Sequence, residues 1–145
     1  MNYWLFITTR DNWEITKEKN LLGAPERNKN QIAKVKKGDK CVLYIKQIFK
    51  GEKADPLVSG EYQVESEVYT DNKQVFNKSP TNPDETFPIR LKVKWLTPSS
   101  KPTAFKPLIP KLSLFANKKN WALRLKGHAV VGISEEDYKT IVSAL

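Results

Sequence analysis

The stretch YWLFITTRDNWE, from Tyr3 to Glu14, decides the fold that the sequence predicts. Residues Tyr3 to Ile7 are bulky and mostly aromatic or β-branched, and this apolar run is too short for a typical helix. Such a run predicts a strand that is buried on both faces. Polarity changes at Thr8, and the spacing from Asp11 to Glu14 is typical of a helix N-cap. A central strand is therefore expected to end in a polar corner where a helix begins at once.

This corner is where we expect a pocket. Within a few residues it brings together two hydroxyls, a guanidinium, an amide and an indole, from Thr8, Thr9, Arg10, Asn12 and Trp13. Such groups form hydrogen bonds with a ligand and stack on flat rings. For Trp13 the sequence leaves a second interpretation open, in which the indole only fastens the helix to the sheet.

The composition is typical of a globular protein. The chain has 145 residues, of which 39% are hydrophobic and 28% charged, and it is expected to form one domain over residues 1–145. It contains no apolar run long enough to span a bilayer and no signal-peptide pattern, so we expect a cytoplasmic protein without a membrane partner. One cysteine, Cys41, and one histidine, His128, argue against a disulfide, a cysteine or histidine metal site and a Ser-His-Asp triad.

The formal net charge of +9 points toward an anionic partner. Excess positive charge attracts phosphate backbones, although a solvated lysine-rich surface is the simpler explanation for any single run of lysines. The runs that are candidates for binding phosphate contain Arg10, Lys34, Lys36, Lys37, Lys118 and Lys119.

The rest of the chain predicts a mixture of strands and short helices, which argues for an α+β fold with a small curled sheet or barrel. Gly60 inside a predicted strand suggests a bulge or a close backbone approach. Besides the first strand, the predicted strands are Cys41–Ile45, Leu57–Tyr69, Phe87–Trp95 and 121–125, with a hairpin-like connection at Ile48–Pro56. The predicted helices are Asn12–Lys19, about Asn30–Val35, and one that Ser134 begins, whereas Leu21–Pro25 is expected to be a loop.

The segment Phe87 to Trp95 alternates in polarity along its whole length. Alternate apolar residues from Phe87 to Trp95 would share the buried face, and Arg90 would lie with Lys92 and Lys94 on a basic outer face.

Several aromatic residues are candidates for stacking on a nucleobase. Base stacking on an aromatic side chain is worth roughly 1–3 kcal/mol per base, and an extruded base is held between apolar walls. Trp13, Trp121, Tyr69 and Phe76 lie beside polar corners or loops, whereas Trp4 and Trp95 fit a core better.

Evidence for catalysis is thin. His128 has no nucleophile near it in the sequence, and the carboxylates are scattered among lysines, where they stay ionised. The six glycines form no loop of the kind that cradles a phosphate. We therefore expect no enzymatic activity, no metal and no cofactor.

Four blocks in order along the chain resemble the EVE domain family: YWLFITTRDNWE, GAPERNKNQIAKVKKGDKCVLYI, GEYQVESEVYTD and FKPLIPKLSLFANKKNWALRLKG. The resemblance covers essentially the whole chain. It implies a PUA-like fold, with a curled mixed sheet flanked by short helices, related to the YTH readers of methylated adenine in RNA. It also implies a pocket for a modified base in RNA or DNA, without catalysis.

The resemblance implies specific pocket residues. Asn30 matches an asparagine of the family's second block, and Leu22 stands where many members have a tryptophan, which removes an indole surface from the pocket. The full set implied for the base pocket is Thr8, Thr9, Asn12, Trp13, Leu22, Asn30, Tyr69, Phe76 and Trp121.

Three functions remain open at this point. The first is a non-enzymatic module that recognises a modified base in nucleic acid. The second is a small enzyme that acts on a nucleotide or small molecule. The third is an interaction module whose basic face binds an acidic partner, with salt dependence but no base preference.

Overall fold

The structure is a computed structural model that describes residues 1–46, 48–49, 52–53, 55–76, 86–97 and 102–145. The strands are β1 (Tyr3–Thr8), β2 (Leu21–Ala24), β3 (Lys40–Ile45), β4 (Ile48–Phe49), β5 (Glu52–Lys53), β6 (Leu57–Val64), β7 (Tyr69–Thr70), β8 (Ile89–Thr97), β9 (Thr103–Ala104) and β10 (Val130–Ile133). The helices are α1 (Arg10–Lys19), η1 (Glu26–Asn28), α2 (Lys29–Ile32), η2 (Lys106–Lys111), η3 (Trp121–Arg124) and α3 (Glu135–Ser143), where η marks a 3₁₀ helix.

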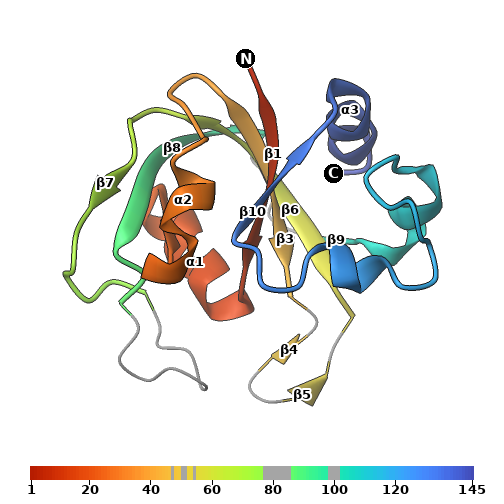
Figure 1. The fold of residues 1–145 in the computed structure, drawn as a ribbon, viewed down its shortest axis with the longest axis horizontal. Helices are drawn as coiled ribbons and strands as arrows, with labels where there is room; N and C mark the ends of the chain where they lie inside the picture. The colour runs from red at the N-terminus through yellow and green to blue at the C-terminus, as the bar shows by residue number, and fades with distance from the viewer. Residues whose placement is uncertain (47, 50–51, 54, 77–85, 98–101) are drawn as a thin grey trace.

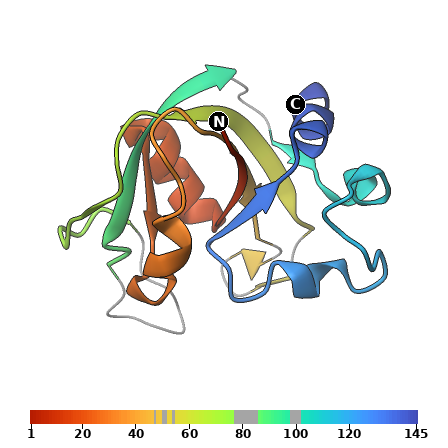
Figure 2. The same cartoon turned by 45° about the horizontal axis from the view of Figure 1, so that its top comes forward.

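A curled mixed sheet carries the fold, as Figures 1 and 2 show. Its strand order is β10-β1-β3-β6-β8-β2, with β7 added to β8 and β9 added to β6. Neighbours in this order pair antiparallel except β1 and β3, which are parallel. The predicted α+β class with a curled mixed sheet and a few short helices is therefore confirmed.

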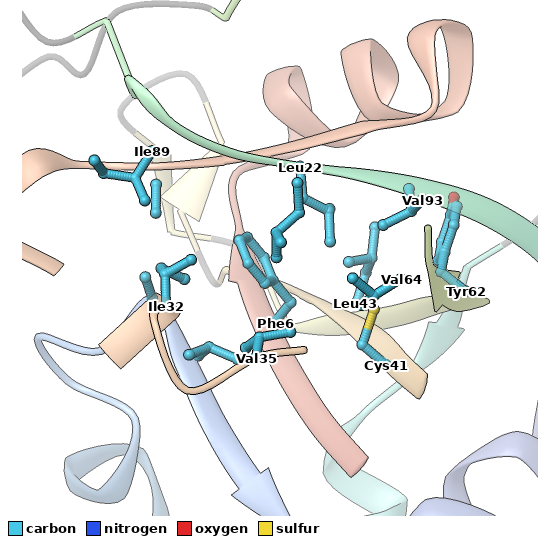
Figure 3. Close-up of a cluster of buried hydrophobic side chains, with 14 of the residues drawn as sticks. Phe6, Leu22, Ile32, Val35, Cys41, Leu43, Tyr62, Val64, Ile89 and Val93 are labelled. Atoms are coloured by element: carbon cyan, nitrogen blue, oxygen red, sulfur yellow. The ribbon is translucent and has the colours of Figure 1, made fainter. Parts of the chain in front are cut away.

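The strand β1 is buried on both faces, as its sequence predicts. Leu5 is fully buried and Phe6 is 2% exposed, and their side chains belong to two separate cores. Phe6 packs with residues of α1, α2 and β2 in the first core, part of which is drawn in Figure 3. Leu5 packs with residues of η2 and α3 in the second core. Alternate residues of one strand thus bury apolar surface on both sides of the sheet.

The strand β6 contains the bulge that its glycine predicts. The pairing with β3 skips Gly60, which has φ +75° and lies between the paired Ser59 and Glu61. A Cβ atom at Gly60 would lie 2.3 Å from the ring of Tyr62, so only glycine fits this close approach.

Several predicted elements need correction. The segment Leu21–Ala24 is a strand, because Leu22 and Ala24 face the first core while the backbone pairs with β8. The segment 121–125 is the 3₁₀ helix η3 instead of a strand. The strand that pairs with β1 near the C-terminus is β10, which the sequence did not reveal.

Helix boundaries also differ from those predicted. The N-cap of α1 is Thr9, whose Oγ1 accepts a hydrogen bond from the Asn12 backbone N–H at 3.2 Å, so the helix begins at Arg10. The second predicted helix is shorter and earlier, as η1 followed by α2. The Ser134 cap of α3 is confirmed, with the Asp137 N–H donating to its hydroxyl at 3.0 Å.

Arg90 does not lie on a basic outer face. Its side chain is 1% exposed and is enclosed by backbone carbonyls and the Asp71 carboxylate. Lys92 and Lys94 are exposed, as predicted.

Candidate functional site

A cavity of about 400 Å³ opens where the parallel strands β1 and β3 end beside the N-terminus of α1. This is the location that the sequence predicts for a pocket. Three stretches supply most of the lining, namely the corner Ile7–Asn12, the segment Gly23–Asn28 and the segment Ala122–Ala129. Tyr44 and Lys46 of the β3 end and Phe87 before β8 complete it.

The corner presents neutral polar groups to the cavity. Thr8, Thr9 and Asn12, three of the residues proposed from the sequence, line it. The Thr8 hydroxyl donates to the Thr9 carbonyl at 3.4 Å, and Thr9 caps the helix. The N-terminal end of α1 adds a partial positive charge from its backbone N–H groups. Hydroxyl, amide and helix-end groups therefore meet at one side of the cavity.

The opposite wall, Ala122–Ala129, is held by amide side chains from η1 and α2. The Asn28 amide donates to the Gly127 carbonyl and to the Gln31 side-chain oxygen, each at 3.1 Å. The same oxygen of Gln31 accepts the Ala129 backbone N–H at 3.0 Å. The Ile7 N–H also donates to the Ala129 carbonyl at 2.8 Å, so this wall is tied to β1 as well.

Two aromatic rings, Tyr44 and Phe87, line the cavity. Burial raises the pKa of the Tyr44 hydroxyl well above its usual range, so the phenol stays neutral. Trp121 lies behind Tyr44, with ring centroids 6.3 Å apart. Phe76 lies behind Phe87, with ring centroids 6.0 Å apart. The rings that line the cavity thus have further rings packed behind them.

The charged residues that line the cavity are cationic. They are Arg27, Lys46 and Lys126, and His128 lies beside them. Among the described residues that form the lining, none is acidic. Loss of hydration lowers the pKa of the Lys46 ammonium, and the charge of Arg27 lowers it further. Nδ1 of His128 lies 3.0 Å from the Lys126 carbonyl, which favours the tautomer with the proton on Nδ1. An anionic ligand therefore meets cations and no carboxylate among the lining residues that the structure describes.

Other residues predicted for the base pocket lie outside this lining. Trp13 is 4% exposed and Leu22 is 1% exposed, both within the first core. Lys17 lies over the Trp13 ring, with its ammonium 3.7 Å from the centroid. This burial fits the second interpretation of Trp13, in which the indole fastens α1 to the sheet.

The remaining predicted pocket residues have three kinds of environment. Asn30 is exposed, and the buried asparagine of this segment that lines the cavity is Asn28. Tyr69 is half-buried on the edge strand β7, with the Lys92 ammonium 6.0 Å from its ring centroid. Phe76 and Trp121 lie one layer behind the lining rings.

The residues predicted to bind phosphate do not line the cavity, and Lys36 lies at the other end of β1 and β3, where its backbone N–H donates to Asp39. Arg10 is half-buried at the start of α1. Lys34, Lys36 and Lys37 are exposed between α2 and β3, and Lys118 and Lys119 are exposed before η3. The Lys118 ammonium donates to the Leu112 carbonyl.

Sequence reasoning missed the residues Arg27, Lys46, Phe87 and Lys126 and the place of His128 in the lining. No local pattern marks them: Arg27 lies in the short helix η1, the others lie outside regular elements, and all reach the cavity through the tertiary fold. The one signal in the sequence was the glycine at position 127, because glycine is typical of tight turns. In the structure Gly127 has φ +78° and turns the chain before β10.

Two other kinds of site were sought in the structure. Across the residues that it describes, no group of three or more His, Cys, Asp or Glu side chains is arranged to hold a metal ion. Within the same residues, no helix has the length and apolar character to cross a membrane.

The sequence and the fold are similar to those of known proteins. A UPF0310 protein of Pyrococcus abyssi is 50% identical over 146 residues, which cover 100% of both chains. The human THYN1 protein, solved in complex with 5-methylcytosine-containing DNA, aligns with a TM-score of 0.64 at 13% identity, covering 99% of this chain and 96% of THYN1. The Mmi1 YTH domain aligns with a TM-score of 0.53 at 11% identity, covering 98% of this chain and 74% of that domain. These two structures share the PUA-like fold that the sequence implied.

The family model of the EVE domain matches residues 2–144. Together with the relative that is identical at half of its positions, this match shows that the chain belongs to the EVE domain family.

Proposed function

We propose that the chain acts in the cytoplasm as a single, non-enzymatic domain that binds nucleic acid and takes one modified, methylated base of RNA or DNA into the cavity. The observation that carries this proposal is the composition of the cavity. It combines neutral hydrogen-bonding groups and two aromatic rings with cationic side chains, and none of the described lining residues is acidic.

Each part of this lining suits a different part of a nucleotide. Threonine hydroxyls and the Asn12 amide pair with the donor and acceptor groups on the edge of a base. The Tyr44 and Phe87 rings offer apolar contact to its faces. Arg27, Lys46 and Lys126 attract the phosphates on either side. The volume of about 400 Å³ falls in the range of small-ligand sites.

The proposal gives the outer lysines a second role. Arg10, Lys34, Lys36, Lys37, Lys118 and Lys119 lie outside the cavity lining and would bind phosphates of the strand at a distance from the bound base. Contacts of this kind add affinity that does not depend on base identity. THYN1, solved with 5-methylcytosine-containing DNA, and the Mmi1 YTH domain have the same fold, which supports a nucleic-acid ligand.

Fluorescence anisotropy with matched oligonucleotides tests the proposal. The set contains DNA and RNA strands of one sequence with cytosine, 5-methylcytosine, adenine or N6-methyladenine at the central position, each titrated at two salt concentrations. We expect one modified strand to bind more tightly than its unmodified partner at both salt concentrations, while overall affinity falls with salt.

Two pairs of variants make this test specific to the cavity. Thr8→Val removes a hydroxyl from the lining, and Thr140→Val removes one from α3 that donates to Glu136 at 3.0 Å. Lys46→Gln removes a charge at the cavity, and Lys139→Gln removes an exposed one on α3. We expect Thr8→Val to lower the preference for the modified strand and Lys46→Gln to weaken all strands, with little effect of either α3 variant.

Each alternative function predicts a different result. Equal binding of all strands that disappears at high salt would favour a basic interaction module. Conversion of a nucleotide by the wild-type protein that is lost in His128→Ala would favour an enzyme.

A further inference from the structure

One wall of the cavity is formed by an aromatic residue in a backbone conformation that such residues rarely adopt. Phe87 lines the cavity and has φ +51°. The left-handed region is strained for a bulky side chain, and the following Pro88 disfavours it further. Strained residues of this kind persist only where surrounding contacts fix them, and they gather at functional sites.

The contacts that fix the Phe87 backbone come from Arg90. Its side chain is 1% exposed. Nε of Arg90 donates to the Phe87 carbonyl at 3.2 Å, and Nη2 donates to the Thr86 carbonyl at 3.3 Å. Nη2 also donates to the Lys73 carbonyl, and Nη1 lies 3.6 Å from the Asp71 carboxylate. One planar guanidinium therefore joins the backbone before β8 to the segment that follows β7.

The Phe87 ring is fixed from the other side by Phe76. The two ring centroids are 6.0 Å apart with the planes inclined by 65°, and Phe76 is 2% exposed. Phe76 in turn lies against Gly23, where a Cβ atom would come within 2.4 Å of its ring. The Arg90 guanidinium carbon lies 5.5 Å from the Phe76 centroid. Arg90 therefore contacts both the backbone of Phe87 and the ring that supports it.

We propose that Arg90 is a positioning residue for ligand binding, which holds the Phe87 ring as a fixed wall against which an uncharged, planar nucleobase packs. This inference rests on the proposed function. The base is uncharged because Arg27, Lys46 and Lys126 surround the same cavity and repel a cationic ring. The buried guanidinium thereby acts on base selection without touching the base.

A double-mutant cycle tests this role. The measured quantity is the ratio of Kd for the unmodified strand to Kd for the modified strand, with the pair of oligonucleotides that the wild-type protein distinguishes best. Arg90→Lys keeps a cation near Asp71 but lacks the planar set of donors. We expect Phe87→Ala and Arg90→Lys each to lower the ratio at least about fivefold, as the loss of base stacking implies. The double variant should be no worse than Phe87→Ala, because both changes remove one interaction.

A structural control separates positioning from stability. Asp137 is 2% exposed and accepts the Ser113 and Leu114 backbone N–H groups at 2.9 Å each, and it does not line the cavity. Asp137→Asn should lower Tm and leave the ratio unchanged. An unchanged ratio in folded Arg90→Lys, or additive effects in the double variant, would overturn the inference alone. A wild-type ratio of one would overturn the proposed function as well.

A second pair of variants applies where Arg90→Lys does not fold. Glycine adopts positive φ without strain, so Phe87→Gly should have a higher Tm than Phe87→Ala, while both lose the base preference. A Tm for Phe87→Ala equal to or above that of Phe87→Gly would show that Phe87 is not held under strain, and the inference would fall.

Discussion

The two walls of the cavity are built in different ways. The corner Thr8–Asn12 is formed by neighbours in sequence, with Thr9 bonded to Asn12 three residues later. The wall Ala122–Ala129 depends on the Asn28–Gly127 and Gln31–Ala129 hydrogen bonds, which join residues 99 and 98 positions apart. The first wall could be read from local pattern, whereas the second exists only once the chain has folded.

Because of this difference, substitutions in the two walls should differ in their effects on protein stability and on the shape of the cavity. The corner is part of the central strand and first helix, so its changes should affect the stability of the whole protein. The opposite wall is joined to the cores through Leu125 and Ala129, whereas its segment around Gly127 is held by the Asn28 amide. Changes to these amide contacts should therefore affect the shape of the cavity more than the core. The following variants test this division.

The largest effect is expected for the tryptophan next to the corner. Trp13→Ala leaves a cavity in the first core and should cost about 3–5 kcal/mol of unfolding free energy, as other buried aromatic truncations do. Trp121→Ala, at a half-buried ring behind the opposite wall, should cost less. Urea unfolding followed by circular dichroism measures both. Equal losses would contradict the division between the two walls.

An asparagine pair tests the opposite wall. Asn28→Ala removes both hydrogen bonds of this buried amide, one of them to the Gly127 carbonyl, which should cost roughly 1–3 kcal/mol. Asn30→Ala changes an exposed side chain and should stay within about 0.5 kcal/mol of the wild type. Denaturant midpoints give the stabilities, and the oligonucleotide titration gives the base preference. We expect only Asn28→Ala to reduce that preference. A reduced base preference in Asn30→Ala would instead support Asn30, which the sequence suggested, as a pocket residue.

A smaller effect is expected at the helix cap of the corner. Thr9→Ala removes the side-chain acceptor of the Asn12 N–H and should cost about 1 kcal/mol. Asp11→Ala removes an exposed first-turn charge and should cost roughly 0.3 kcal/mol. If thermal unfolding ranks the two in the reverse order, Asp11 is the N-cap, as the sequence suggested.

The smallest effect is a pH dependence that distinguishes Lys46, which follows β3 beside the corner, from Lys126 of the opposite wall. The pKa of Lys46 is lowered, so its ammonium loses its proton at a lower pH than an ordinary lysine. Because only the charged form attracts phosphate, affinity should fall as pH rises through this pKa. A DNA strand of adenine and cytosine, whose bases do not titrate in this range, measures the step. We expect Lys46→Gln to remove the step and Lys126→Gln to leave it in place; the opposite result would assign it to the other wall.

The sequence predicts the fold better than the site, for a physical reason. A buried strand, an alternating strand and a capped final helix each have a local pattern, and these three are confirmed as β1, β8 and α3. The polar residues Thr8, Thr9 and Asn12 follow directly from the end of β1, so their place at the cavity was predictable too.

The failures have equally specific causes. Trp121, Leu123 and Leu125 alternate like a strand, but the edge beside β1 is filled by β10, and the segment forms η3 instead. Arg90 sits at a polar position of an alternating strand, yet carbonyls from before β8 and after β7 enclose it. Local pattern carries no information on which backbone groups will surround a side chain.

The pairing of β1 with β10 has a consequence for protein synthesis. Tyr3 pairs with Ile133, so β1 is synthesised long before β10, the strand that pairs with it. Until then one edge of β1 lacks its partner, and the carbonyl of Ala129 cannot reach Ile7. The cavity is therefore completed only after β10 has been synthesised, and a truncated chain that lacks β10 presents an open sheet edge beside β1.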